Sequence, residues 1–257
     1  MATIRALLLA AAIVPAVGSP AGEPARAEYA VRWDPAEGGP ASAREVLSLL
    51  GASGIAGRAY EIRYFEFPRP ANAPPDTIAI LRQRTREDGK AEIRLKYRSA
   101  QPLPKTWACP DGARFEKAEE LDVSFAASSE PVRVHACSCT LVAKAPPAVL
   151  GAAPNPCTSR MVRYEFEGDK IEEWTLPGAG VRLEVSRAAP NSPGELAKFS
   201  GLVERLRARG VRPLDQSKTD GSRCPDGNAP SASPTPERSD GAREALPAAV
   251  SGRRRYP

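Results

Sequence analysis

The 257-residue chain has a single histidine, His135, and no short motif that is typical of a common catalytic site. No serine or cysteine stands in a recognisable nucleophile motif. On one strand, the i to i+4 spacing of His135 and Cys139 is too long for direct proton transfer. A glycine-rich phosphate loop and a dinucleotide-binding fingerprint are also lacking. These absences argue against nucleophilic catalysis by histidine pairs and against the common nucleotide-binding loops.

Long apolar runs are absent after the first twenty residues, so no segment of the mature chain is expected to cross a membrane as a helix. At the start, Arg5 precedes an almost uncharged run over residues 6–17, and small residues follow, as in a secretory signal peptide. Cleavage fits after Gly18, after Ala21 or after Ala27. We therefore expect a signal peptide within residues 1–27 and an exported protein that is periplasmic or extracellular.

Internal repeats are not visible, and 42% hydrophobic residues in a chain of this size can bury one sizeable core. We expect one domain over residues 28–224. Residues 225–257 are rich in Pro, Ser, Ala and Gly and have no hydrophobic period, which predicts a disordered tail. The arginines at 253–255 could contact an anionic lipid or polymer, or remain solvated.

The net charge of +5 is modest, and the cations are spread along the chain instead of forming one block. This distribution favours an acidic ligand and argues against sequence-specific recognition of nucleic acid. The sequence does not indicate an oligomeric state.

Five cysteines fit an oxidising compartment, in which thiols pair into structural disulfides. They are Cys109, Cys137, Cys139, Cys157 and Cys224. The odd number leaves at least one of them free or paired with another chain. On a strand, Cys137 and Cys139 would share a face with His135 and could hold a soft metal, but the favoured interpretation places the two cysteines in separate disulfides.

Alternating segments that are rich in β-forming residues dominate the middle of the chain. Strands are predicted over residues 28–33, 60–67, 77–86, 91–98, 120–125, 132–142, 161–167, 170–176 and 181–187. Asp88-Gly89 and Gly168-Asp169 predict tight hairpins, because these residue types tolerate positive φ. Helical spacing is found over residues 41–50 and 193–209. The predicted fold is mainly β (α+β): an antiparallel β-barrel or tunnel, or a sandwich, with a few packed helices.

The hairpin at Asp88-Gly89 gathers positive charge on one face of its two strands. Arg82, Arg84 and Arg86 alternate in the first strand, and Arg94, Lys96 and Arg98 alternate in the second. Like charges on neighbouring strands repel unless an anion lies among them, and the planar guanidinium group binds phosphate oxygens in pairs. The alternative interpretation is an ordinary solvent face, where ion pairs contribute little.

Several short motifs, in order, resemble those of the CYTH superfamily, also called the triphosphate tunnel metalloenzymes. They are Tyr64-Phe65-Glu66, Leu81-Arg82-Gln83-Arg84, Asp88-Gly89-Lys90, Ile93-Arg94-Leu95-Lys96, Arg182-Leu183-Glu184-Val185 and Ser217-Lys218. The resemblance spans about residues 28–218. Each motif is short, so its specificity lies in their order and spacing.

The resemblance implies an antiparallel barrel whose tunnel binds triphosphates or polyphosphate together with Mg²⁺ or Mn²⁺. Carried onto this sequence, it implies that phosphate oxygens are bound by Arg32, Arg82, Arg84, Arg94, Lys96, Arg98, Arg182 and Lys218. The metal ligands that it implies are Glu28, Glu120, Asp122 and Glu184.

The first strand departs from the family pattern Glu-x-Glu-x-Lys. Here the matching residues are Glu28, Ala30 and Arg32, so the middle carboxylate is missing. Losing one ligand weakens metal binding and the activation of an attacking water. The favoured hypothesis is an exported tunnel domain that binds polyphosphate or another phosphorylated anion, with weak or no catalysis. The alternatives are an active metal-dependent triphosphate or polyphosphate phosphohydrolase, and an envelope scaffold without a phosphate ligand.

Overall fold

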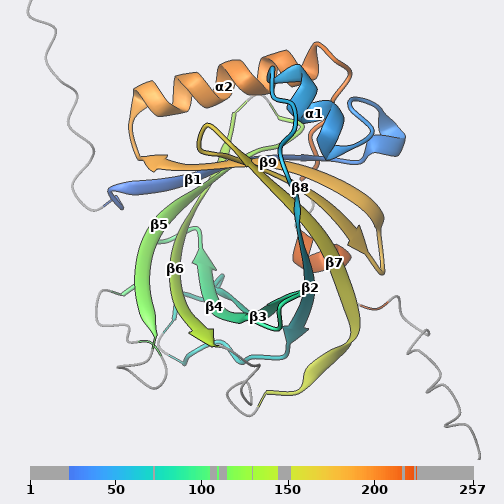
Figure 1. Ribbon diagram of the computed structural model, residues 1–257. Coiled ribbons are helices and arrows are strands. Elements are labelled where there is room, and N and C mark those ends of the chain that lie inside the picture. The colour runs from blue at the N-terminus through green and yellow to red at the C-terminus, as the bar shows by residue number, and fades with distance from the viewer. Residues whose placement is uncertain are drawn as a thin grey trace, which may run out of the picture.

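A computed structural model describes residues 23–71, 73–104, 109, 115–128, 130–143, 152–215, 218–222 and 224. These residues form one closed β-barrel with its two longest helices packed on its outside (Figure 1). The predicted tail, and residues 1–22 of the predicted signal peptide, lie outside the described residues. None of the described helices is both long enough and apolar enough to cross a membrane.

Nine strands and four helical segments are described. The strands are β1 (Arg26–Trp33), β2 (Arg58–Phe65), β3 (Ile78–Arg86), β4 (Ala91–Ser99), β5 (Glu116–Phe125), β6 (Val132–Ala143), β7 (Pro154–Phe166), β8 (Asp169–Leu176) and β9 (Gly180–Pro190). The helical segments are η1 (Pro35–Glu37), α1 (Ala43–Leu49), α2 (Pro193–Arg207) and α3 (Lys218–Gly221). Every predicted strand and both predicted helices are present, whereas η1 and α3 were not predicted.

Around the barrel the strands follow the order β1-β5-β6-β4-β3-β2-β7-β8-β9, and β9 pairs with β1 to close the ring. Neighbours are antiparallel except β1 and β5, which run parallel. The predicted antiparallel barrel is therefore confirmed apart from this pair, and a sandwich is excluded. A closed ring with an odd number of strands cannot alternate direction at every junction, so at least one pair must be parallel.

The largest hydrophobic cluster lies outside the barrel, between its wall and helices α1 and α2, which lie across β1, β8 and β9 (Figure 1). Phe199 of α2 stacks on Tyr29 of β1 with ring centroids 5.8 Å apart. Helix α2 begins where the Ser192 side chain accepts a hydrogen bond from the Glu195 N–H, which is the usual N-cap contact. Because the apolar faces of these strands pack outward, their other faces are left for the barrel interior.

A second apolar cluster covers the outer face of β3, β4 and β6. Its buried members are Leu81, Ile93, Leu95, Tyr97 and Cys139. Successive side chains of a strand point to opposite faces, so this outward packing turns the alternating cations of the hairpin into the barrel. The cations that the sequence placed on one face of the hairpin therefore lie on the face opposite this apolar cluster.

Two disulfides join Cys109 to Cys139 and Cys157 to Cys224, and Cys137 is free and buried. The prediction that Cys137 and Cys139 lie in separate disulfides is therefore wrong for Cys137. The physical reason is that Cys137 is buried opposite Tyr97 of β4, and Cys109, the described cysteine that reaches this outer face from elsewhere in the chain, is already bonded to Cys139. That bond also removes Cys139 as a metal ligand.

Candidate functional site

A cavity of about 70 Å³ lies inside the barrel and is lined mainly by charged side chains. The cationic lining residues are Arg32, Arg82, Arg84, Arg94, Lys96, Arg98, Arg163 and Lys218, and the acidic ones are Glu28, Glu172 and Glu184. Positive charge is therefore in excess along the cavity wall. These residues do not form an ordinary solvent face, because they converge on one cavity inside the barrel.

Strand register explains why the hairpin cations converge. In the β3–β4 pair, Arg82 lies opposite Arg94 and Arg84 lies opposite Glu92. In the neighbouring β2–β3 pair, Tyr64 lies opposite Arg82. Directly opposite residues project from the same face of a sheet, so these side chains share the interior.

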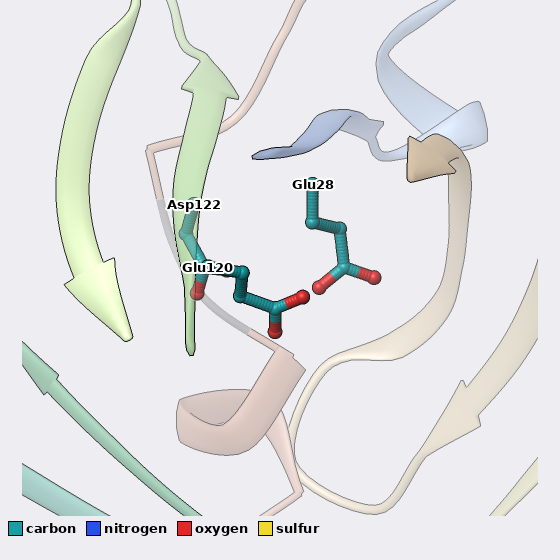
Figure 2. Close-up of side chains that lie close together, drawn as sticks. All are labelled: Glu28, Glu120 and Asp122. Carbon is teal, nitrogen blue, oxygen red and sulfur yellow. The ribbon is translucent and has the colours of Figure 1, made fainter. Parts of the chain in front are cut away.

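Three carboxylates form an acidic cluster at the β1–β5 junction: Glu28 of β1, and Glu120 and Asp122 of β5. Glu28 and Asp122 are register partners in the parallel pair. One oxygen of each residue lies within 4.8 Å of the others, and Figure 2 shows the carboxylates of Glu28 and Glu120 turned toward each other. Carboxylate oxygens at this spacing could hold a metal ion.

The ammonium group of Lys96 lies among these three carboxylates. Its Nζ is 2.8 Å from Glu120 Oε1, 2.8 Å from Asp122 Oδ1 and 3.2 Å from Glu28 Oε2. Arg98 Nε donates to the other Asp122 oxygen at 2.6 Å. The Lys96 charge holds the pKa of the Glu28 carboxyl well below its usual range. Burial opposes the charge of Lys96, but Glu28 and Asp122 nevertheless raise its pKa. The acidic cluster therefore already has a cation at its centre.

A second carboxylate pair, Glu172 of β8 and Glu184 of β9, is formed by register partners. Lys218 Nζ bridges them, at 2.9 Å from Glu172 Oε2 and 2.7 Å from Glu184 Oε1. Arg163 Nε donates to Glu172 Oε1 at 2.8 Å, and Arg32 forms an ion pair with Glu184. Burial alone would raise the pKa of Glu172, but Lys218 and Arg163 hold it well below its usual range. These carboxylates are also neutralised from within the protein.

Three cavity residues, Arg82, Arg84 and Arg94, lack such close partners, and we call them the arginine group. Arg84 Nη1 and Arg94 Nε lie 3.9 and 3.7 Å from Glu92 Oε1. Within the described part of the chain, Arg82 has no carboxylate in salt-bridge range, and the Nε atoms of Arg84 and Arg94 are buried without a hydrogen-bond partner. Burial, with repulsion from Arg82 and Arg163, lowers the pKa of Arg84 to about 9. Three guanidinium groups therefore lie near the single carboxylate of Glu92, so positive charge is in excess here.

The cavity brings together seven of the eight residues that were predicted to bind phosphate. The exception is Arg182, which lines a separate smaller pocket and donates to Asp34 Oδ2 at 2.6 Å. Of the four predicted metal ligands, three form the acidic cluster, whereas Glu184 lies with Glu172.

Arg163 and Glu172 line the cavity but were not predicted from the sequence, and neither was the pairing of Glu92 with Arg84 and Arg94. Glu172 is 2% exposed and accepts a hydrogen bond from Trp174 Nε1 at 2.9 Å. The strand that carries Glu172 was predicted, but Glu173 comes directly after Glu172, so each face of β8 carries a glutamate. The alternation of side chains could not indicate which of the two points inward. The weak signal was Trp174, an aromatic residue that shares the face of Glu172.

Comparisons with known proteins leave the family open: no protein-family model and no curated protein matches the chain. Solved structures to which the chain shows some similarity include the PH1012 protein from Pyrococcus horikoshii OT3, which is 16% identical, with 75% of this chain and 98% of that chain covered and a TM-score of 0.44. A conserved hypothetical protein from Pyrococcus furiosus is 16% identical, with 72% and 92% covered and a TM-score of 0.40. A Vibrio parahaemolyticus protein named as a putative adenylate cyclase is 10% identical, with 78% and 98% covered and a TM-score of 0.38. Similarity at these scores does not establish a shared family or a shared ligand.

Proposed function

We propose that this protein is an exported, CYTH-like barrel that binds a phosphorylated anion, such as polyphosphate or a phosphorylated envelope component, with weak or no catalysis. The observation that carries the proposal is the arginine group, in which buried guanidinium donors lack acceptors. Leaving a buried donor unsatisfied is costly, and a phosphate group would supply several acceptor oxygens at once.

The distribution of charge in the cavity supports an anion at the arginine group. Lys96 and Lys218 are engaged by carboxylates at 2.7–3.2 Å. Among the described residues, Glu92 is the one carboxylate in salt-bridge range of Arg84 and Arg94, at 3.9 and 3.7 Å, and Arg82 has none. Guanidinium groups that lie close together in a low-dielectric interior repel one another. With a pKa of about 9, Arg84 keeps its positive charge at neutral pH, so loss of a proton does not relieve this repulsion. A bound anion relieves it instead.

Aromatic contacts hold two of the cavity arginines in place before any ligand binds. The guanidinium carbons of Arg84 and Arg163 lie 5.4 and 5.7 Å from the ring centroid of Tyr60. Such cation–π contacts orient the planar groups, and preorganised donors lose less entropy on binding. Phosphate, whose oxygens accept paired guanidinium hydrogen bonds, is the anion that this arrangement suits best.

Weak or absent catalysis is proposed because β1 contributes Glu28 and Arg32 to the cavity with Ala30 between them, where no carboxylate is available. If the acidic cluster held a metal, its hard oxygen ligands would suit Mg²⁺ or Mn²⁺. Its carboxylates are already engaged by Lys96 and Arg98. Export is proposed from the signal-like first residues and is supported by the two disulfides, which need an oxidising compartment to persist.

The test is thermal unfolding of the mature protein with tripolyphosphate, long-chain polyphosphate or ATP, each with EDTA and with Mg²⁺ or Mn²⁺. A ligand at about a hundred times its Kd stabilises the folded state by about 2.7 kcal/mol, which raises Tm by about 5–10 °C in a protein of this size. Arg84→Gln should abolish the shift. Arg63→Gln is the matched control, because Arg63 is half-exposed and pairs with Glu61 at 3.0 Å.

Absence of a shift with every phosphate ligand would overturn the proposal and favour a scaffold. Release of orthophosphate that depends on Mg²⁺ or Mn²⁺ and on the acidic cluster would instead identify a phosphohydrolase.

A further inference from the structure

Lys96 occupies the centre of the acidic cluster, which is where a divalent cation would have to lie. We propose that Lys96 is a built-in counter-ion that replaces the metal, so that the cavity binds its anion without a divalent cation. The claim that the anion binds without a divalent cation rests on the proposed function. The claim that Lys96 replaces the metal depends only on the geometry around Lys96.

The hydrogen-bonding capacity of Lys96 is matched by the acidic cluster. An ammonium group carries three N–H donors, and three carboxylates lie within 3.2 Å of its Nζ. The side chain of Lys96 is only 9% exposed. Lys96 is therefore a partner of the carboxylates and is not free to bind phosphate, in contrast to the role that the family resemblance implies for it.

A divalent ion cannot share this position with the ammonium group. Mg²⁺ requires oxygen ligands at about 2.0–2.1 Å, so it would lie between the same oxygen atoms and be repelled by Nζ at close range. To admit the metal, Lys96 would have to leave the cluster. Its neighbours on the same face of β4 are Arg94 and Arg98, so a displaced ammonium would move toward other cations.

The charge count around the acidic cluster also argues against a bound metal. Three carboxylates face two close cations, because Arg98 is bonded to Asp122 as well. Only one negative charge remains uncompensated, whereas a divalent ion brings two positive charges. With Lys96 and Arg98 retained, metal binding would leave the cluster positively charged in a buried environment that already has an excess of cations.

The experiment uses Mn²⁺ as the probe, with the free ion measured by electron paramagnetic resonance in metal-free buffer and without phosphate. The wild-type protein should bind no Mn²⁺ at the cluster up to millimolar concentration. Lys96→Met removes the ammonium and keeps the aliphatic stem, and it should bind one Mn²⁺ at least about tenfold more tightly. Lys90→Met, in the exposed β3–β4 turn, is the matched control and should behave as wild type.

Wild-type binding of one Mn²⁺ that is lost in Glu120→Gln would overturn the inference, and so would a folded Lys96→Met protein that gains no Mn²⁺ affinity. If Lys96→Met unfolds without metal, recovery of its cooperative melting on addition of Mn²⁺ supports the inference. If it does not fold under either condition, the wild-type titration decides alone.

A phosphate arm separates this inference from the proposed function. Tripolyphosphate should shift the Tm of the wild-type protein equally in EDTA and in Mn²⁺. A shift that needs Mn²⁺ contradicts the inference while leaving phosphate binding intact. No shift under either condition contradicts the proposed function, and the Mn²⁺ titrations then still decide the role of Lys96.

Discussion

Cys157 of β7 and Cys224 are joined by a disulfide, which ties the chain after α3 to the barrel wall. Next to this bond, Ser159 Oγ donates to Ser222 Oγ at 2.9 Å, and both serines are buried. Helix α3 has four residues, which is too short to be stable alone. The disulfide therefore helps to position Lys218, the first residue of α3, between its two carboxylate partners inside the cavity.

Replacing both cysteines, as Cys157→Ser/Cys224→Ser, should lower stability and anion affinity together. The bond spans 67 residues, and loss of a disulfide of this kind costs about 2–4 kcal/mol of unfolding free energy. We expect about a tenfold loss of tripolyphosphate affinity, or about 1.4 kcal/mol, because Lys218 would no longer shield the negative charge of Glu172 and Glu184. Urea denaturation and titration calorimetry measure the two effects.

The control is Cys109→Ser/Cys139→Ser, which removes the disulfide on the outer face. It should lower stability but leave anion affinity unchanged. Lys218→Met should reproduce the loss of affinity in the wild-type background and add little to it when Cys157 and Cys224 are already replaced. Full affinity without the Cys157–Cys224 bond would show that α3 holds Lys218 unaided.

Glu172 should make stability depend on pH in the acid range. Its pKa is lowered in the folded state, so its contribution is present above the ordinary value of 4.5 and is lost as pH falls below it. At about pH 7, Glu172→Gln should cost about 3 kcal/mol, because Arg163 and Lys218 lose a charged partner. The difference from wild type should shrink as pH falls from 4.5 toward the lowered folded-state pKa, because the unfolded state takes up its proton first.

Urea unfolding at several pH values measures this difference. Glu165→Gln is the matched control, since Glu165 is an exposed glutamate on β7 and its replacement changes the charge by the same amount. A difference between wild type and Glu172→Gln that stays constant with pH would contradict the assignment of ion-pair energy to Glu172.

The hairpin of β3 and β4 was predictable because its two faces differ. Ile93 and Leu95 alternate with Arg94 and Lys96, so only one face could pack against an apolar cluster. Asp88-Gly89 supplied the turn, and Gly89 has the positive φ of 79° that favours glycine. Local pattern therefore defined both the strand pair and the face that carries the cations.

The partners of those cations were not predictable, because they depend on how distant strands close the barrel. Lys96 and Arg98 lie opposite Ser138 and Ala136 of β6, and these small side chains leave room for both cations to reach the acidic cluster on the far side of β6. Nothing in the sequence of β4 indicates that Lys96 and Arg98 reach carboxylates beyond β6. The same holds for the parallel pairing of β1 with β5, which places Glu28 beside Asp122.

The mature protein should begin before Glu23, if the first residues are a signal peptide as proposed. Asn191 Nδ2 donates to Glu23 Oε2 at 3.0 Å, and Ala27 pairs with Ala189 at the start of β1. Cleavage after Ala27 would remove these contacts and leave Glu28 at a frayed end. The intact mass of the exported protein should therefore match one of the two earlier cleavage points, and an N-terminus at Glu28 would contradict this prediction.

Cys137 should be a single thiol that is unreactive in the folded protein. The residue is 4% exposed, and burial raises the pKa of its thiol, so little of the reactive thiolate forms at neutral pH. We expect iodoacetamide to label the native protein at least about tenfold more slowly than the urea-unfolded protein. Unfolded wild type should incorporate one label per chain, as measured by intact mass, and unfolded Cys137→Ser none. Rapid labelling of native protein would contradict the burial of this thiol, and an unfolded chain without any free thiol would show that Cys137 forms a disulfide with another chain.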